Sequence, residues 1–244
     1  MKALVKSEFL KLSTDRSAYG VLAALLAVMV VGVFAIVTAA TTAELAETPL
    51  HRLPFLQFGP TGLGLLILLL GIRSFGDEFR HGTITPTLLV NPQRSQVVAA
   101  KMLAFALVGL AFSLIADAIM LAVAVPLIAS RGVDVPISAG DLLATLGGVA
   151  LATSLGAVIG VGVGAVVRHR VPAIVGAIVW ILVAETFITG RWPDLGKFLP
   201  AQAANDLAQQ PGELAAWAGG LVLGAYVVVW GTAALITMHR RDVA

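Results

Sequence analysis

Few residues of this chain could carry chemistry, and they lie in three places. The stretch GDEFRHGTITPTLL, residues 76–89, gathers two acids, an arginine and a histidine between apolar runs. Asp117, in LIADAIM, and Glu185, in LVAETFI, lie within apolar runs themselves. A carboxylate at membrane depth costs about 3 kcal/mol, so both acids are candidates for a cargo or proton path. The competing interpretations are a hydrogen-bonded packing residue for Asp117 and an interface residue for Glu185.

Motifs of enzymes are missing from the sequence. The chain has no cysteine, no G-x-S-x-G nucleophile elbow and no G-x-x-x-x-G-K-[ST] phosphate loop. Its four histidines lie far apart, without the i, i+4 pairing that holds a metal, at His51, His81, His169 and His239. We therefore expect a protein that is not an enzyme, with no metal or cofactor of its own.

The composition is that of a membrane protein. Hydrophobic residues make up 58% of the chain and charged residues 12%, with a mean hydropathy of +0.94. A water-facing domain of this size needs more polar surface than that. The net charge is only +2, and the basic residues are dispersed, so they indicate membrane topology rather than nucleic-acid binding.

Six apolar runs are long enough to cross a bilayer, which takes about 20 residues as a helix. They predict a single all-α membrane domain, residues 1–244, with spans near 20–42, 57–75, 102–129, 141–167, 172–188 and 214–238. Twelve of the 16 Lys and Arg residues then fall on one side, together with both termini. Because cytoplasmic flanks collect basic residues, we expect both termini in the cytoplasm.

The segment before the first span, residues 1–19, has an amphipathic pattern. One helical face collects Leu4, Val5, Phe9 and Leu12, and lysines lie on the other. This predicts a helix in the cytoplasmic interface of the membrane. An ordinary charged tail that only sets topology remains the alternative.

Small residues organise the fourth span. Gly156, Gly160 and Gly164 recur every four residues, and Gly148 lies two turns earlier. Such ridges let helix backbones approach closely in lipid. We expect tight packing within the chain here, rather than a dimer contact.

Residues 76–101 connect the second and third spans by more than a tight turn requires. Asp77 and Glu78 are expected in an early turn of a short surface helix, where the helix dipole favours acids, and Gly82 is placed to end it. Such a helix could dock a soluble partner. A solvated loop whose Arg94 and Lys101 only set topology is equally compatible with the sequence.

The connection between the fifth and sixth spans, residues 189–213, is long enough to hold structure. Pro200 is expected to open a short helix with Leu199, Ala203 and Leu207 facing the membrane surface. This outer re-entrant segment could form a lid over an exit path, and a simple loop is the alternative.

Three segments carry a resemblance to a known family: SEFLKLSTDRSAY, DEFRHGTITPTLLVNPQRSQVVAAKML and KFLPAQAANDL. Together they resemble the membrane subunit of an ABC transporter of the ABC-2 type, a family of six-span permeases that export drugs, peptide antibiotics, polysaccharides and lipids. The resemblance implies a coupling helix between spans two and three that contacts an ATP-binding subunit. Residues matching its E-x-x-x-G-T core are Glu78, Arg80, Gly82 and Thr83, and Asn91, Pro92 and Arg94 match the turn downstream.

The resemblance also implies a half-transporter in the cell membrane. Two six-span subunits, identical or related, would surround a central path, and separate subunits would bind ATP and Mg²⁺. Family architecture places the path on spans two and five. The candidate residues that line it are Phe58, Leu66, Trp180 and Phe187. The apolar character of these spans favours a hydrophobic or amphipathic cargo.

Two other functions stay open. A proton-coupled carrier could use Asp117 and Glu185 as titrating groups without ATP. A membrane subunit that does not transport could use the segment at 76–101 for docking alone. An ABC permease should co-purify with a stoichiometric ATPase, whereas a proton-coupled carrier should not. Cargo should stimulate ATP hydrolysis with an ABC permease but not with a subunit that only docks.

Overall fold

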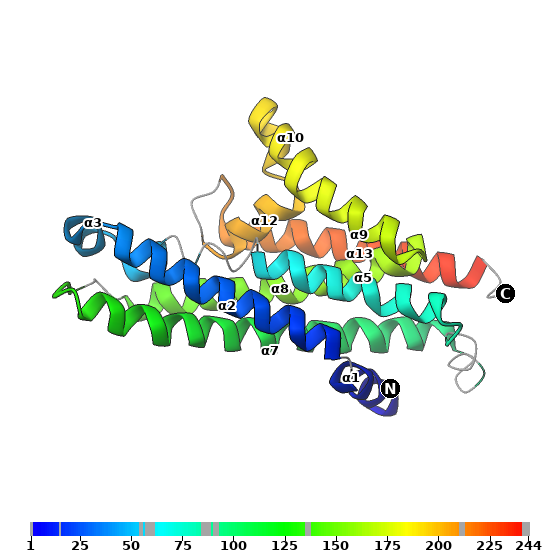
Figure 1. Cartoon of the computed structure of the whole chain (residues 1–244). Helices are drawn as coiled ribbons and strands as arrows, with labels where there is room; N and C mark the ends of the chain where they lie inside the picture. The colour runs from blue at the N-terminus through cyan, green and yellow to red at the C-terminus, as the bar shows by residue number, and fades with distance from the viewer. Residues whose placement is uncertain are drawn as a thin grey trace.

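The computed structural model describes residues 2–14, 16–53, 56, 62–83, 89, 93–134, 138–209 and 213–240. All regular secondary structure within these residues is helical, as predicted, and both ends of the chain lie toward the same end of a long bundle (Figure 1). The first elements are α1 (Lys2–Thr14), α2 (Arg16–Ala39), α3 (Thr42–Glu47), η1 (Leu50–Arg52) and α5 (Gly64–Arg80). They are followed by α7 (Arg94–Ala129), α8 (Ala139–Val167), α9 (Arg170–Val179), η3 (Trp180–Glu185), α10 (Thr186–Arg191), α11 (Pro193–Gly196), α12 (Pro200–Leu207) and α13 (Ala216–Arg240).

Five of the described helices are long and apolar enough to cross a membrane. They are residues 22–39 within α2, α7, α8, the continuous helix from Arg170 to Arg191, and α13. The helix at the expected second span, α5, is not among them, because it has 17 residues and ends in the charged sequence DEFR. The chain is therefore a multi-pass membrane protein.

The helices around the second and third expected spans run further than predicted. α5 continues to Arg80 instead of ending at residue 75, and α7 begins at Arg94, eight positions before residue 102. Much of the predicted connecting segment, residues 76–101, is thus the end of one long helix and the start of another. The short separate helix expected for GDEFR is wrong, since these residues belong to α5.

The N-terminal boundary also differs. α1 ends at Thr14 and α2 begins at Arg16, so the first membrane helix starts before the predicted residue 20. α1 lies apart from the axis of α2 and next to the start of α7 (Figure 1). The expected interfacial helix is therefore a separate element of 13 residues.

α8 is the central helix, and it packs against α5, α7, α13 and α12. The predicted close packing along its glycines is confirmed. A Cβ atom at Gly160 would overlap the carbonyl oxygen of Leu68 in α5, and one at Gly148 would overlap that of Leu207 in α12. Larger side chains at these two positions would push the backbones apart, so the small residues set the distance between α8 and its neighbours.

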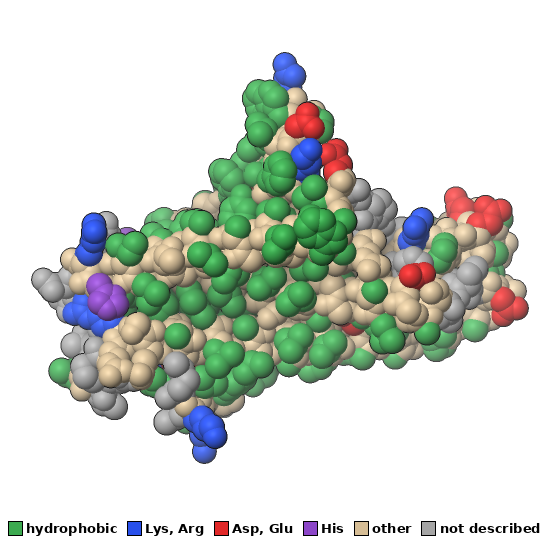
Figure 2. Space-filling model, turned by 180° about the vertical axis from the view of Figure 1, so that it is seen from behind, with side chains coloured by type: hydrophobic (Ala, Val, Ile, Leu, Met, Phe, Trp, Pro, Cys, Tyr) green, Lys and Arg blue, Asp and Glu red, His purple; other side chains and the backbone are tan. Residues whose placement is uncertain are grey.

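The helix formed by α9, η3 and α10 leaves the bundle at an angle, with α10 projecting furthest (Figure 1). The middle segment, Trp180–Glu185, is a π-helix, a form that often marks functional positions. Hydrophobic side chains are spread over the middle of the face seen in Figure 2, and charged ones gather toward its two ends and on the projection. This distribution fits a bundle whose middle lies in hydrocarbon.

The predicted short helix after the fifth span exists as α12, and Pro200 is its first residue. Its expected orientation is wrong, because Ala203 and Leu207 are buried against α8 and α13 rather than facing a membrane surface. Gly219 of α13 makes this packing possible, since a Cβ atom there would lie 2.6 Å from the Ala203 carbonyl oxygen. α12 is therefore part of the bundle's interior.

Candidate functional site

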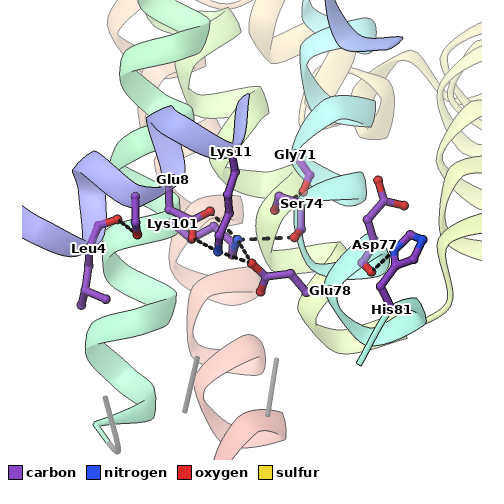
Figure 3. Close-up of polar contacts among 10 residues, drawn as sticks. Leu4, Glu8, Lys11, Gly71, Ser74, Asp77, Glu78, His81 and Lys101 are labelled. Carbon is purple, nitrogen blue, oxygen red and sulfur yellow. Dashed lines mark hydrogen bonds and ion pairs between the residues drawn. The ribbon is translucent and has the colours of Figure 1, made fainter. Parts of the chain in front are cut away.

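Four charged side chains from three helices meet at the end of the bundle where α5 ends and α7 begins (Figure 3). Lys101 of α7 lies between Glu8 of α1 and Glu78 of α5, with Nζ–Oε distances of 2.5 and 3.0 Å. Lys11 of α1 contacts the same two carboxylates at 2.7 and 2.6 Å. We call Glu8, Lys11, Glu78 and Lys101 the charged cluster.

The charged cluster is largely closed to solvent. The side chain of Lys101 is 1% exposed and those of Glu8 and Glu78 are each 8% exposed, whereas Lys11 is 46% exposed. The Lys101 ammonium also lies 5.1 Å from the ring centre of Phe75. Removing one partner of a buried ion pair costs about 3–5 kcal/mol, because it leaves the other charge uncompensated. The cluster therefore fixes α1 against α5 and α7.

The position of Glu8 changes the interpretation of α1. Leu4 and Leu12 lie on the same side of the helix as Glu8, one turn before and one turn after it. Phe9, expected on that apolar face, is 38% exposed, and Leu10 is 66% exposed. The buried face of α1 therefore centres on an acid that needs a cation, and the exposed Phe9 and Leu10 are available to lipid.

The charges of the cluster reinforce one another. Burial alone would raise the pKa of Glu8, but the ammonium groups of Lys101 and Lys11 outweigh burial and hold this pKa below its usual value of 4.5. Burial would lower the pKa of Lys11, whereas hydrogen bonds to Glu78 and Glu8 raise it above 10.5. Both groups are therefore charged near neutral pH.

The neighbours of Glu78 in α5 contact other helices. Asp77 points away from the charged cluster (Figure 3) and accepts a hydrogen bond from Arg170 of α9 at 3.0 Å. The ring of Phe79 lies 4.9 Å from the guanidinium carbon of Arg168, at the end of α8. Three successive residues of α5 thus connect its last turn to α1, α7, α8 and α9.

The acids of DEFR lie in the last turn of α5, where the helix dipole disfavours them, so the expected early-turn position is wrong. Cations from other helices offset this cost. Gly82 adopts φ +66°, and the Thr83 N–H donates to the Glu78 carbonyl oxygen at 3.0 Å, which ends the helix as predicted.

The four predicted coupling residues divide into two kinds. Glu78 is buried inside the bundle, whereas Arg80, Gly82 and Thr83 are exposed. Asn91 and Pro92 lie outside the described residues, and Arg94, the first residue of α7, donates to the Met238 carbonyl oxygen. Only the exposed residues of this set are placed to touch a soluble partner.

The candidate path residues are not brought together. Phe58 lies outside the described residues, and Leu66 is half-buried in α5. Trp180 and Phe187, 47% and 66% exposed, lie on the outer surface of the projecting helix. Asp117 is 3% exposed and accepts a hydrogen bond from Ser113 of the same helix at 3.3 Å. A path through one copy of the chain would not include all of them.

Glu185 has a structural contact that the sequence did not indicate. Its side chain is 2% exposed, and one carboxylate oxygen accepts a hydrogen bond from the Ala201 N–H, in the first turn of α12, at 2.9 Å. It therefore joins the projecting helix to α12, and it shares no hydrogen-bond partner with Asp117.

Sequence reasoning missed Glu8, Lys11 and Lys101 as members of one site. A residue of a docking segment and a residue that only sets topology were the two interpretations of Lys101, and neither indicated its partners, which lie 93 and 23 positions away in the chain. A signal was present in Glu8, a lone acid on an otherwise apolar helix face. Within the described residues, no three His, Asp or Glu side chains lie close enough to bind a metal ion.

Comparison with protein families identifies a family for most of the chain. Residues 4–184 match the model of the ABC-2 family transporter proteins, and this range runs from α1 to η3 and includes the whole charged cluster. No curated protein matches the sequence. Since the family model spans most of the chain, the protein belongs to the ABC-2 family of transporter proteins.

Proposed function

We propose that the chain is the permease subunit of an ATP-driven exporter for a hydrophobic or amphipathic cargo. Family membership supports a membrane component of an ABC transporter. The sequence has no phosphate-binding loop, so ATP and Mg²⁺ would bind to a separate subunit. In this proposal α5 counts as a sixth crossing, and the end of the bundle that carries the charged cluster faces the cytoplasm.

The observation that carries the proposal is the set of contacts at the last turn of α5. A partner that moves the exposed turn at residues 80–83 would move α5, and Asp77, Glu78 and Phe79 would pass this displacement to four other helices. Transport then follows from two arrangements of the bundle whose populations ATP binding shifts. The chain contributes no bond chemistry.

The path would lie between two copies of the chain, or between this chain and a related permease. The helix from Arg170 to Arg191 supports this arrangement, because only 11% of its most apolar stretch is buried within the chain, against 67% in α8. Trp180 and Phe187 then face the second copy and the path, together with Leu66.

Affinity purification of the tagged chain from its own membranes tests this function. We expect mass spectrometry to identify a co-purifying protein with a phosphate-binding loop. We expect Arg80→Ala and Thr83→Ala to reduce its recovery, since both side chains are exposed beside the turn. Arg240→Ala, an exposed residue at the same end of the bundle, is the matched control and should leave recovery unchanged. Purification of the intact chain without any ATPase would contradict the proposal.

The alternative carrier function is favoured by the burial of Asp117 and Glu185. It predicts that a proton gradient drives transport without ATP and that the Asp117→Asn variant no longer transports. The role of Glu185 in holding α12 gives this acid a structural use, which favours the exporter. A docking subunit without transport would bind the ATPase but would not stimulate it.

A further inference from the structure

A basic groove lies on the other side of α5 from the charged cluster. Its walls are the last turn of α5 and the turn between α8 and α9. The polar side chains that line it are Arg80, Arg168, His169 and Arg170, and no acid lines it among the described residues. Asp77 does not line the groove but pairs with Arg170 at 3.0 Å. Three guanidinium groups thus line the groove, and that of Arg170 has a carboxylate partner.

The groove is built by close contact between backbones. Gly76 lets α9 begin next to α5, since a Cβ atom there would lie 3.0 Å from the Cβ of Arg170. Arg168 ends α8 with φ 60°, a conformation that is rare for residues other than glycine. It donates to the Thr237 carbonyl oxygen at 3.1 Å and lies over the Phe79 ring, which hold its guanidinium at the groove.

Arg80 differs from the other arginines of the groove. It is exposed and makes no hydrogen bond or ion pair within the part of the chain that the structure describes. A planar guanidinium without an internal partner can bind a phosphate through two parallel N–H groups. Arg80 is therefore available to a ligand from outside the chain.

An apolar strip leads away from the groove along α9. Val171 lines the groove and is 66% exposed, and Val175 and Val179 follow on the same face, 52% and 50% exposed. Because α9 is the start of a membrane-crossing helix, the groove lies at headgroup depth and the strip lies in hydrocarbon. Figure 2 shows Lys, Arg and His side chains next to hydrophobic ones at this end of the visible face.

We propose that this groove binds the phosphate of an anionic phospholipid, with an acyl chain along Val171, Val175 and Val179. The basic lining selects a negative headgroup over a zwitterionic one, since each nearby arginine contributes about 1 kcal/mol toward an anionic surface, or about fivefold in affinity. The apolar strip selects a lipid over a free anion. The proposal requires only that the chain spans a membrane. It places Arg80 against a lipid in the free chain, whereas the proposed exporter places Arg80 against the ATPase, so the lipid test is made on the chain without the ATPase.

Native mass spectrometry of the purified full chain tests the proposal. The chain is reconstituted in an equimolar mixture of phosphatidylcholine and phosphatidylglycerol, extracted gently, and its retained lipids are counted. We expect the parent chain to retain phosphatidylglycerol in preference to phosphatidylcholine. This preference should be about fivefold weaker in Arg80→Gln and should be restored in Arg80→Lys. Arg80→Gln breaks no hydrogen bond or ion pair among the described residues, so its folding should match the parent, and an unchanged melting temperature verifies this.

Two further variants and a competition experiment complete the test. Arg240→Gln removes an exposed charge at the same end, outside the groove, and should leave retention unchanged. Val175→Asp should lower retention without touching a basic residue, and inorganic phosphate should not compete. Equal retention of both lipids, an equal loss in Arg240→Gln, or competition by inorganic phosphate would each overturn the proposal. So would an Arg80→Gln variant that loses the co-purifying ATPase and keeps its phosphatidylglycerol, because the groove would then be a protein-docking surface.

Discussion

α5 and the helix from Arg170 to Arg191 are neighbours in the bundle, but they are held in different ways. Nine of the 17 residues of α5 are buried, and its Gly71 lies against α8 so closely that a Cβ atom would be 2.5 Å from the Ala157 carbonyl oxygen. The helix from Arg170 to Arg191 is exposed along most of its length. Among the described residues, it makes polar contacts to the other helices at Asp77–Arg170, near one end, and at Glu185–Ala201, further along.

α5 is held on most of its surface by other helices, whereas the helix from Arg170 to Arg191 is mostly exposed. α5 cannot shift without moving α8 and the helices tied to its last turn. The projecting helix packs against the bundle through Ala173, Ile174, Ala177 and Ile181, and its other sides are largely apolar and exposed. This combination fits a bundle in which α5 receives the movement and the projecting helix changes its neighbours.

Leucine at Gly160 should produce the largest effect. Its Cβ alone would overlap the Leu68 carbonyl oxygen. We therefore expect the free energy of unfolding to fall by more than ~4 kcal/mol, which leaves no folded protein in the membrane. Gly176→Leu is the matched control in the projecting helix, where no atom lies within 4 Å of the added Cβ. Fluorescence-detection size-exclusion chromatography compares the two variants. Equal accumulation would show that α5 and α8 are not packed as described.

Lys101→Met should have the next largest effect, because it leaves Glu8 and Glu78 buried around a neutral side chain. The free energy of unfolding should fall by about 3 kcal/mol. Lys11→Met removes the other cation of the cluster, but that side chain is 46% exposed, so the loss should be below about 1 kcal/mol. Thermal unfolding in detergent ranks the variants, and a Lys11→Met variant that is the less stable of the two would contradict this account.

Glu185→Ala should loosen one attachment of the projecting helix. The Ala201 N–H loses its acceptor, at a cost of about 1–2 kcal/mol, so hydrogen exchange at the start of α12 should be about tenfold faster. Exchange in α5 should not change. Thr186→Ala, one position further along the same helix and exposed, is a suitable control. Unchanged exchange at Ala201 would mean that Glu185 does not hold α12.

The attachment of α1 should resist mild acid. The pKa of Glu8 in the folded chain is below 4.5, so its contribution to stability is complete above that pH and is lost as the pH falls through the lowered pKa. Protease cleavage of α1 should therefore stay constant from neutral pH down to 4.5 and rise only below it. Cleavage that already increases on going from pH 7 to pH 6 would contradict this assignment.

The sequence predicted those parts of the fold that depend on local patterns. Apolar run length identified α8 within two residues at its start and at its observed end, and the recurrence of Gly156, Gly160 and Gly164 indicated its close packing. The start of α12 followed from Pro200, because proline suits the first helical turn.

Long-range charge compensation could not be predicted in the same way. The acids of DEFR are stabilised in the last turn of α5 by cations that approach from other helices, among them Lys101 and Arg170. Local helix rules place such acids at a helix start, which led to the wrong boundary at residue 75. The hydrogen bond from the Ala201 N–H to Glu185 could not be predicted either, since this donor lies 16 residues further along the chain.

Permease-stimulated ATP hydrolysis in Glu78→Ala tests the central claim most directly. Lys101 keeps Glu8 as a partner in this variant, so the chain should still insert, and the exposed Arg80 and Thr83 should still bind the ATPase. We predict that the co-purifying ATPase is recovered in full while its stimulation by the reconstituted permease is lost. Stimulation equal to that of the parent chain would show that the charged cluster does not carry movement from α5 into the bundle.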